Sequence, residues 1–203
     1  MKPGPDDPVL PFADSAAFET WLARNHRTAT VVWIQHAKKD SGLPTVTWTE
    51  AVDVALCYGW IDGQSRSLDA THYIQRYTPR RPKSMWSKIN RERVARLIAD
   101  GRMQPAGLAE VDRAKADGRW DVAYDSPKTS TVPPDLAAAL AKNKKARAAF
   151  EALSKSNRYM ILHRVQTAKK PETRAKRIAD FVATLASAGT ERPSTRTAAA
   201  RKG

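Results

Sequence analysis

The change in residue pattern near residues 126–134 most constrains how this chain can fold. Before it, β-branched and aromatic runs such as "TVVWIQHAK" alternate with helix-like runs such as "TEAVDVALCYGW". After "SPKTSTVPP" the periodicity is helical, and "RIADFVATL" places apolar residues at i, i+3, i+4 and i+7. The pattern predicts an α+β protein, with a small antiparallel sheet packed by helices and then an all-helical C-terminal segment.

The same change predicts how the 203 residues are divided into segments. Residues 1–11 are rich in proline and aspartate, and residues 189–203 form a basic tail, so both are expected to be disordered. An α+β domain is expected over residues 12–125, followed by a helical segment over residues 133–188. Residues 126–132, with few apolar side chains, are expected to form a linker between them.

Charge is distributed unevenly between the two parts. The net charge of the chain is +14. Residues 1–125 carry 18 basic and 16 acidic side chains, whereas residues 126–203 carry 17 and 5, a net charge of +12. Such asymmetry favours an anionic partner, including non-specific nucleic acid bound by the basic C-terminal helices and tail. The alternative is a basic protein of Arg- and Ala-rich composition whose charge serves solubility.

Several classes of site and location are not indicated by the sequence. The four histidines are scattered, and no Gly-rich phosphate loop or nucleophile elbow occurs, so we expect neither a metal nor a cofactor. The single cysteine, Cys57, lies in an apolar run and is expected to be a buried, inert thiol. No apolar run reaches the roughly 18 residues of a membrane span. The N-terminus resembles no export signal, so a cytoplasmic location is expected.

The stretch "QRYTPRRPKSMWSKINRER", residues 75–93, holds seven basic residues and one acid. It lies where a strand ends, prolines keep the chain extended, and a helix begins with Ser84 or Ser87 as its N-cap. A helix N-terminus with arginine forks is a natural anion site. The alternative is a solvated face. The residues predicted to bind a ligand are Trp60, Asp62, Arg76, Tyr77, Arg80, Arg81, Lys83, Ser84, Trp86, Ser87 and Arg91.

Two carboxylates are candidates for acid–base catalysis. Asp53 lies in an apolar helix and Asp62 follows Trp60 in "GWIDGQ". A carboxylate in apolar surroundings can have a raised pKa and transfer protons near neutral pH. The commoner role of such a residue is an internal ion pair, here with one of the arginines at positions 76, 80 and 81.

Four blocks bear a family resemblance. "ALCYGWIDGQ", "QRYTPRRPKSMWSKINRERVARLIADGRM", "AEVDRAKADGRWD" and "QTAKKPETRAKRI" resemble, in that order, the YdeI/OmpD-associated or bacteriocin-protection family over about residues 18–187. That family is bacterial and archaeal, and it has no established reaction. The resemblance implies a link to envelope stress, to an envelope-protein partner and to resistance against bacteriocins and cationic antimicrobial peptides. Members have been predicted to be periplasmic, which the N-terminus of this chain does not indicate.

Together these features predict a cytosolic, cofactor-free binding protein with an anion pocket around residues 60–91. A first alternative is a small cofactor-independent enzyme that uses Asp62 or Asp53 as its base and holds an anionic substrate with arginines. A second alternative is a non-specific nucleic-acid binder.

Overall fold

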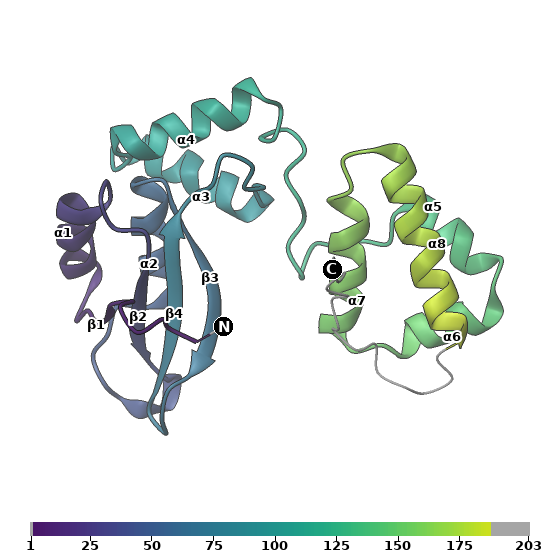
Figure 1. Cartoon of the computed structure of the whole chain (residues 1–203), viewed down its shortest axis with the longest axis horizontal. Coiled ribbons are helices and arrows are strands. Elements are labelled where there is room, and N and C mark those ends of the chain that lie inside the picture. The colour runs from purple at the N-terminus through teal and green to yellow at the C-terminus, as the bar shows by residue number, and fades with distance from the viewer. Residues whose placement is uncertain (1, 188–203) are drawn as a thin grey trace, which may run out of the picture. The chain divides into compact units, whose positions relative to one another are not determined.

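The computed structural model describes residues 2–187. The chain divides into two compact units, Met1–Ala123 and Tyr124–Gly203. The first unit contains a sheet and helices, and the regular elements of the second, over its described residues 124–187, are helices (Figure 1). The α+β class predicted from the sequence is therefore confirmed.

The sheet of the first unit has four strands in the order β1-β2-β4-β3. These strands are β1 (Val9–Pro11), β2 (Val32–Ala37), β3 (Trp60–Ser67) and β4 (His72–Pro79). The β2–β4 and β3–β4 pairs are antiparallel, but β1 pairs with β2 in parallel. The sheet is thus mixed, and the prediction of an antiparallel sheet is wrong at this edge.

The N-terminal segment is ordered where disorder was expected. Residues 9–11 form β1, and Pro8 accepts a hydrogen bond from the backbone N–H of Trp33. The Trp33 indole donates to Asp7 at 3.1 Å. The segment whose prolines and aspartates suggested a loose chain instead forms a short edge strand, and its Asp7 contacts Trp33. Both depend on partners more than 20 residues away, which local composition does not indicate.

The first unit, over its described residues, also contains four α-helices and a 3-10 turn. The helices are α1 (Ser15–Asn25), α2 (Trp48–Cys57), α3 (Lys88–Ala99) and α4 (Pro105–Ala116), and the 3-10 turn, η1, lies at Lys39–Ser41. The central helix α2 is buried from Ala51 to Cys57 and contacts α1, β3, α3 and α4. Its start is defined by a capping box in which Thr47 and Glu50 each accept from the other's backbone N–H.

The end of α2 is formed by a close approach of two helices. Gly59 adopts φ +75°, which ends the helix and starts β3. Gly107 of α4 lies so close to the α2 backbone that a Cβ at this position would be 2.2 Å from the Cys57 carbonyl oxygen. Cys57 is buried, as predicted, and burial raises the pKa of its thiol to about 11. The thiol is therefore protonated and unreactive at neutral pH.

The second unit consists of α5 (Pro134–Ala141), α6 (Lys144–Ala152), α7 (Lys155–Gln166) and α8 (Pro171–Ser187). Its own core includes Leu136, Phe150, Val165 and Ile178. The segment expected to be a linker, residues 126–132, belongs to this unit and begins with a hydrogen-bonded turn in which Ser126 contacts Thr129. The predicted tail, residues 189–203, lies outside the described residues.

Candidate functional site

The predicted basic stretch forms a stack of arginine and tryptophan side chains in the first unit. The guanidinium of Arg80 lies 3.5 Å from the ring centroid of Trp86, and both residues are nearly fully buried. Arg80 also donates to the carbonyl of Met85 at 3.3 Å. Desolvation strengthens the attraction between a cation and an aromatic face, so this pair stabilises the passage from β4 to α3.

The stack continues through residues that follow α4. The rings of Trp86 and Trp120 pack edge to face with centroids 4.9 Å apart, and Arg91 donates to the Trp120 carbonyl at 2.8 Å. Arg119 donates to the Ser84 carbonyl at 2.7 Å. The guanidinium groups of Arg80, Arg91 and Arg119 therefore join the segments 84–86 and 119–120. We define Arg80, Trp86, Arg91, Arg119 and Trp120 as the arginine–tryptophan cluster.

The two serines near the start of α3 have different roles. Ser87 is the N-cap, since its hydroxyl accepts from the Asn90 N–H at 3.2 Å. Ser84 accepts from the Arg81 N–H at 3.0 Å and closes the turn that precedes the helix. The side chains of Arg81 and Lys83 are exposed beside that turn. The predicted order of strand, proline passage and capped helix is thus present, with exposed cations next to a buried cationic cluster.

Asp62 and Tyr77 form a separate polar group on the sheet. They face each other across β3 and β4. Asp62 is half-buried and accepts from the Trp48 indole at 3.2 Å, while burial raises the pKa of its carboxyl. The hydroxyl of Tyr77 is buried with no hydrogen-bond partner among residues 2–187, and burial raises its pKa as well. The positive charges of Arg80 and Arg93 oppose the rise at Asp62.

Asp53 has a structural environment. Its carboxylate, 11% exposed, accepts from Arg93 at 2.6 Å and also from Arg96, so it joins α2 to α3. The partners are not the arginines considered from the sequence, at positions 76, 80 and 81. A carboxylate held by two guanidinium groups of a neighbouring helix forms an interhelical ion pair, which is a structural role.

Two more of the predicted ligand residues lie away from the cluster. Trp60 is in the core, where its ring packs against Trp21 with centroids 5.9 Å apart. Arg76 pairs with Trp33 across β4 and β2, and its charge acts on Asp7 of the N-terminal segment. Since side chains alternate along β4, Arg76 faces the opposite side of the sheet from Tyr77.

Sequence reasoning missed Arg119 and Trp120, which complete the cluster. A local signal for them exists, because "DGRWD" places an arginine and a tryptophan directly after Gly118, whose φ is +74°. It also missed Trp48 as the donor to Asp62. Over residues 2–187, no group of three or more His, Cys, Asp or Glu side chains could hold a metal ion, and no helix could cross a membrane.

Two parts of the chain match known families. Residues 10–110 match a domain of unknown function (DUF8412). Residues 129–188 match the family described as bacteriocin-protection, YdeI or OmpD-associated. This second match covers 60 of the 203 residues, all of them in the second unit. Comparison with curated proteins and with solved structures found no match.

The match to the bacteriocin-protection family coincides with the helical unit. It includes α5, α6, α7 and α8, and with them the block "QTAKKPETRAKRI" of the sequence resemblance. The blocks "ALCYGWIDGQ" and "QRYTPRRPKSMWSKINRERVARLIADGRM" lie instead within the match to the domain of unknown function. The resemblance is therefore confirmed for the second unit, and the arginine–tryptophan cluster lies in the first.

Proposed function

We propose that this protein is a binding protein that takes a small anion, a carboxylate or a phosphate, at the arginine–tryptophan cluster. Its role is related to bacteriocin protection, as the match of residues 129–188 supports. The anion lies beside the start of α3, where the Ser87 cap ends the extended passage and the exposed cations Arg81 and Lys83 mark the approach from solvent.

Two buried donors next to this helix start support the proposal. Nη2 of Arg119 and Nε1 of Trp86 have no hydrogen-bond partner among residues 2–187, and the two residues are 5% and 1% exposed. An unsatisfied buried donor costs about 1–3 kcal/mol, and more when it is charged. An anion that accepts from both groups would remove that cost, and the positive end of the α3 dipole would add to its binding.

Charge balance in the cluster points the same way. The Arg119 guanidinium donates from Nε to both oxygens of Asp117 at 2.7 Å, but that carboxylate side chain is 45% exposed and leaves Nη2 unused. Arg91 is held by a backbone carbonyl and the face of Trp120. A carbonyl and a ring orient a guanidinium group without neutralising it, so at Arg91 a bound anion has charge to compensate.

An NMR titration tests the anion site. We expect phosphate, sulfate or succinate, added at constant ionic strength, to shift the indole N–H resonance of Trp86 saturably, because a new acceptor changes the shielding of that proton. The five other indole resonances should move less, and Trp86→Phe assigns the signal. Arg119→Gln should abolish the shift, while Arg81→Gln with Lys83→Gln should weaken binding by about three- to tenfold through lost steering charge.

Arg113→Gln is the matched control, since it removes an exposed arginine that is paired with Glu110 on α4 and lies outside the cluster. It should leave the titration unchanged. An indole signal of Trp86 that does not respond to any of the three anions, in a protein whose melting is normal, would contradict the proposal.

A second candidate function is proton transfer at Asp62. The observation in its favour is the pairing of a half-buried carboxyl of raised pKa with the unsatisfied Tyr77 hydroxyl across the strands. Such a pair could exchange a proton with a bound substrate. The neighbouring Arg80 would then orient an anionic substrate group.

A further inference from the structure

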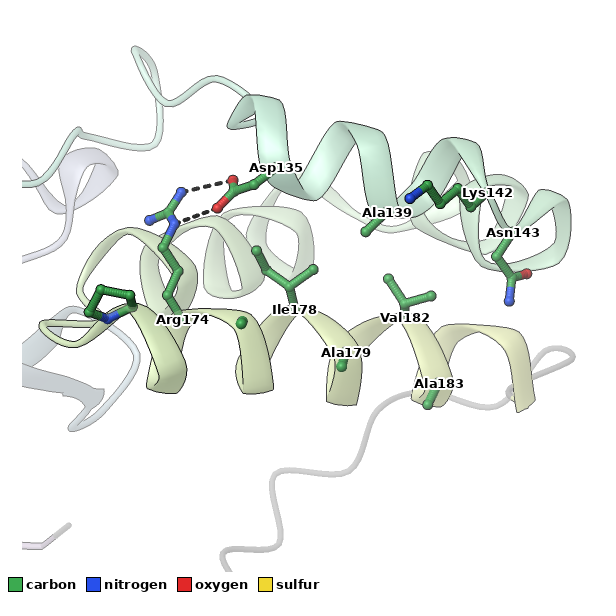
Figure 2. Close-up of a pocket in the computed structure, with 11 residues that line it drawn as sticks. Asp135, Ala139, Lys142, Asn143, Arg174, Ile178, Ala179, Val182 and Ala183 are labelled. Carbon is green, nitrogen blue, oxygen red and sulfur yellow. Dashed lines mark hydrogen bonds and ion pairs between the residues drawn. The ribbon is translucent and has the colours of Figure 1, made fainter.

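A groove of about 740 Å³ runs between α5 and α8 in the second unit (Figure 2). Its floor is apolar and is formed by Ala139 of α5 with Ile178 and Val182 of α8. Along one side, Ala179 and Ala183 are exposed and four residues apart. Small side chains at this spacing lie in one row of a helix and let a second rod-like element approach closely.

Cationic groups stand at both ends of the groove. Lys142 is exposed at one end, and Arg174 lies at the other, where it donates to both oxygens of Asp135 at 2.6 and 3.0 Å (Figure 2). Asp135 is the one carboxylate among the groove residues, and its charge is balanced by this fork. Over the described residues 124–187 the unit has 13 basic and 5 acidic side chains, a net charge of +8.

We propose that this groove binds an acidic amphipathic helix of a partner protein. Apolar side chains spaced i, i+3 or i+4, and i+7 on that helix would cover Ala139 and Val182, and its flanking carboxylates would face Lys142 and the positive field of the unit. The inference is independent of the anion site, because it rests on residues of the second unit alone.

Other occupants fit the groove less well. The chain's own residues 188–203 have four basic residues and one acidic residue, so their charge has the wrong sign, as does that of a second copy. A nucleic acid would bring phosphates onto an apolar floor, which offers them no hydrogen bonds. A bilayer is a flat surface, whereas the groove is concave between two helices and suits a rod.

Fluorescence anisotropy with the full chain tests the proposal. The probe is a labelled synthetic peptide of about five helical turns, with leucines at the spacing above and glutamates on the remaining face. We expect saturable binding at physiological ionic strength. Ala179→Trp should weaken it about tenfold by filling the groove, and Lys142→Glu should weaken it severalfold by reversing a rim charge.

Matched variants and peptides separate this site from general attraction to a basic protein. Ala148→Trp on α6 and Lys155→Glu on α7 change exposed residues outside the groove and should bind as the wild type does. A scrambled peptide of equal composition, and one with lysines for glutamates, should bind at least tenfold more weakly. Equal binding of the scrambled peptide, or undiminished binding by Ala179→Trp, overturns the proposal. The proposal is also overturned if the peptide fails to bind and the protein instead binds anionic phosphatidylglycerol vesicles in a way that Ala179→Trp abolishes.

Discussion

At the scale of single residues, the buried histidine of β2 makes the stability of the first unit depend on pH. His36 is 1% exposed, its Nδ1 lies 2.8 Å from the Val46 carbonyl oxygen, and its ring stacks on Tyr73. Nδ1 therefore donates, and Nε2 is left without a hydrogen-bond partner among residues 2–187. Burial lowers the pKa of His36, and the contact with Val46 only partly opposes this.

We predict that this unit loses stability as the pH falls below about 6.5, the ordinary pKa of histidine. In that window the unfolded chain binds a proton that folded His36 does not accept, so the free energy of unfolding falls by up to about 1.4 kcal/mol per pH unit. Urea titrations at pH 7.5 and 5.5 measure the effect. Tryptophan emission is a specific signal, because all six tryptophans lie between residues 21 and 120.

His36→Asn keeps a donor for Val46 and removes the titration, so its unfolding free energy should change less between the two pH values. The comparison with wild type at each pH also cancels the opposite contribution of Asp62, whose raised pKa stabilises the fold as the pH falls. His163→Asn is the control in the second unit, where burial lowers the pKa of another histidine. A wild-type slope equal to that of His36→Asn would contradict the prediction.

Single residues also show how far the candidate site follows from sequence. Arg80 and Trp86 are six positions apart, on either side of a proline passage, so their proximity is a local matter. Arg119 reaches the Ser84 carbonyl from 35 residues away, and no periodicity near residue 84 indicates it. Arg76 shows the converse. It is next to Tyr77 in the sequence, but side chains alternate along β4, so the two residues face opposite sides of the sheet.

At the scale of elements, the contact of α4 with the end of α2 depends on the absence of a side chain. We predict that Gly107→Ala destabilises the first unit by about 1–3 kcal/mol, because the new Cβ would overlap the Cys57 carbonyl and force the helices apart. The higher helix propensity of alanine, worth about 1 kcal/mol, offsets only part of this. Urea unfolding followed by tryptophan emission measures the change.

Gly63→Ala is the comparison, since a Cβ on β3 would make an ordinary 3.6 Å contact with the Arg76 carbonyl oxygen. Its stability should stay within about 0.5 kcal/mol of wild type. A Gly107→Ala protein as stable as Gly63→Ala would mean that α4 can shift away from Cys57 without cost.

Helix starts are easier to predict from sequence than strand pairing is. Asp14, Thr47 and Ser87 each cap a helix through a partner three residues along the chain, so the signal is contained in a short window. The parallel pairing of β1 with β2 joins residues 24 positions apart. Residues 9–11 are too few to show the alternation of a strand. Only their pairing with β2 makes them one.

At the scale of the whole molecule, the two units have separate cores. Each hydrophobic cluster contains residues of one unit only: the main cluster of the first unit runs from Phe12 to Ala123, and that of the second from Leu136 to Leu185. The two family matches, residues 10–110 and 129–188, divide the chain at the same place. A unit with its own core can fold without the rest of the chain.

We therefore predict that residues 1–123 and residues 124–203, expressed separately, each fold. The first fragment should unfold cooperatively with the tryptophan emission of the full chain, because it retains every tryptophan and the whole sheet. The second should give a helical circular dichroism spectrum with a lower melting temperature, since a domain of about 60 residues buries only about 60% of its unfolded surface. Phe150→Ala should unfold the second fragment and leave the first unit of the full chain intact, because Phe150 belongs to the second core alone. If the first fragment gave a non-cooperative melt, or if Phe150→Ala abolished tryptophan burial in the full chain, the two cores would depend on each other and the division would be wrong.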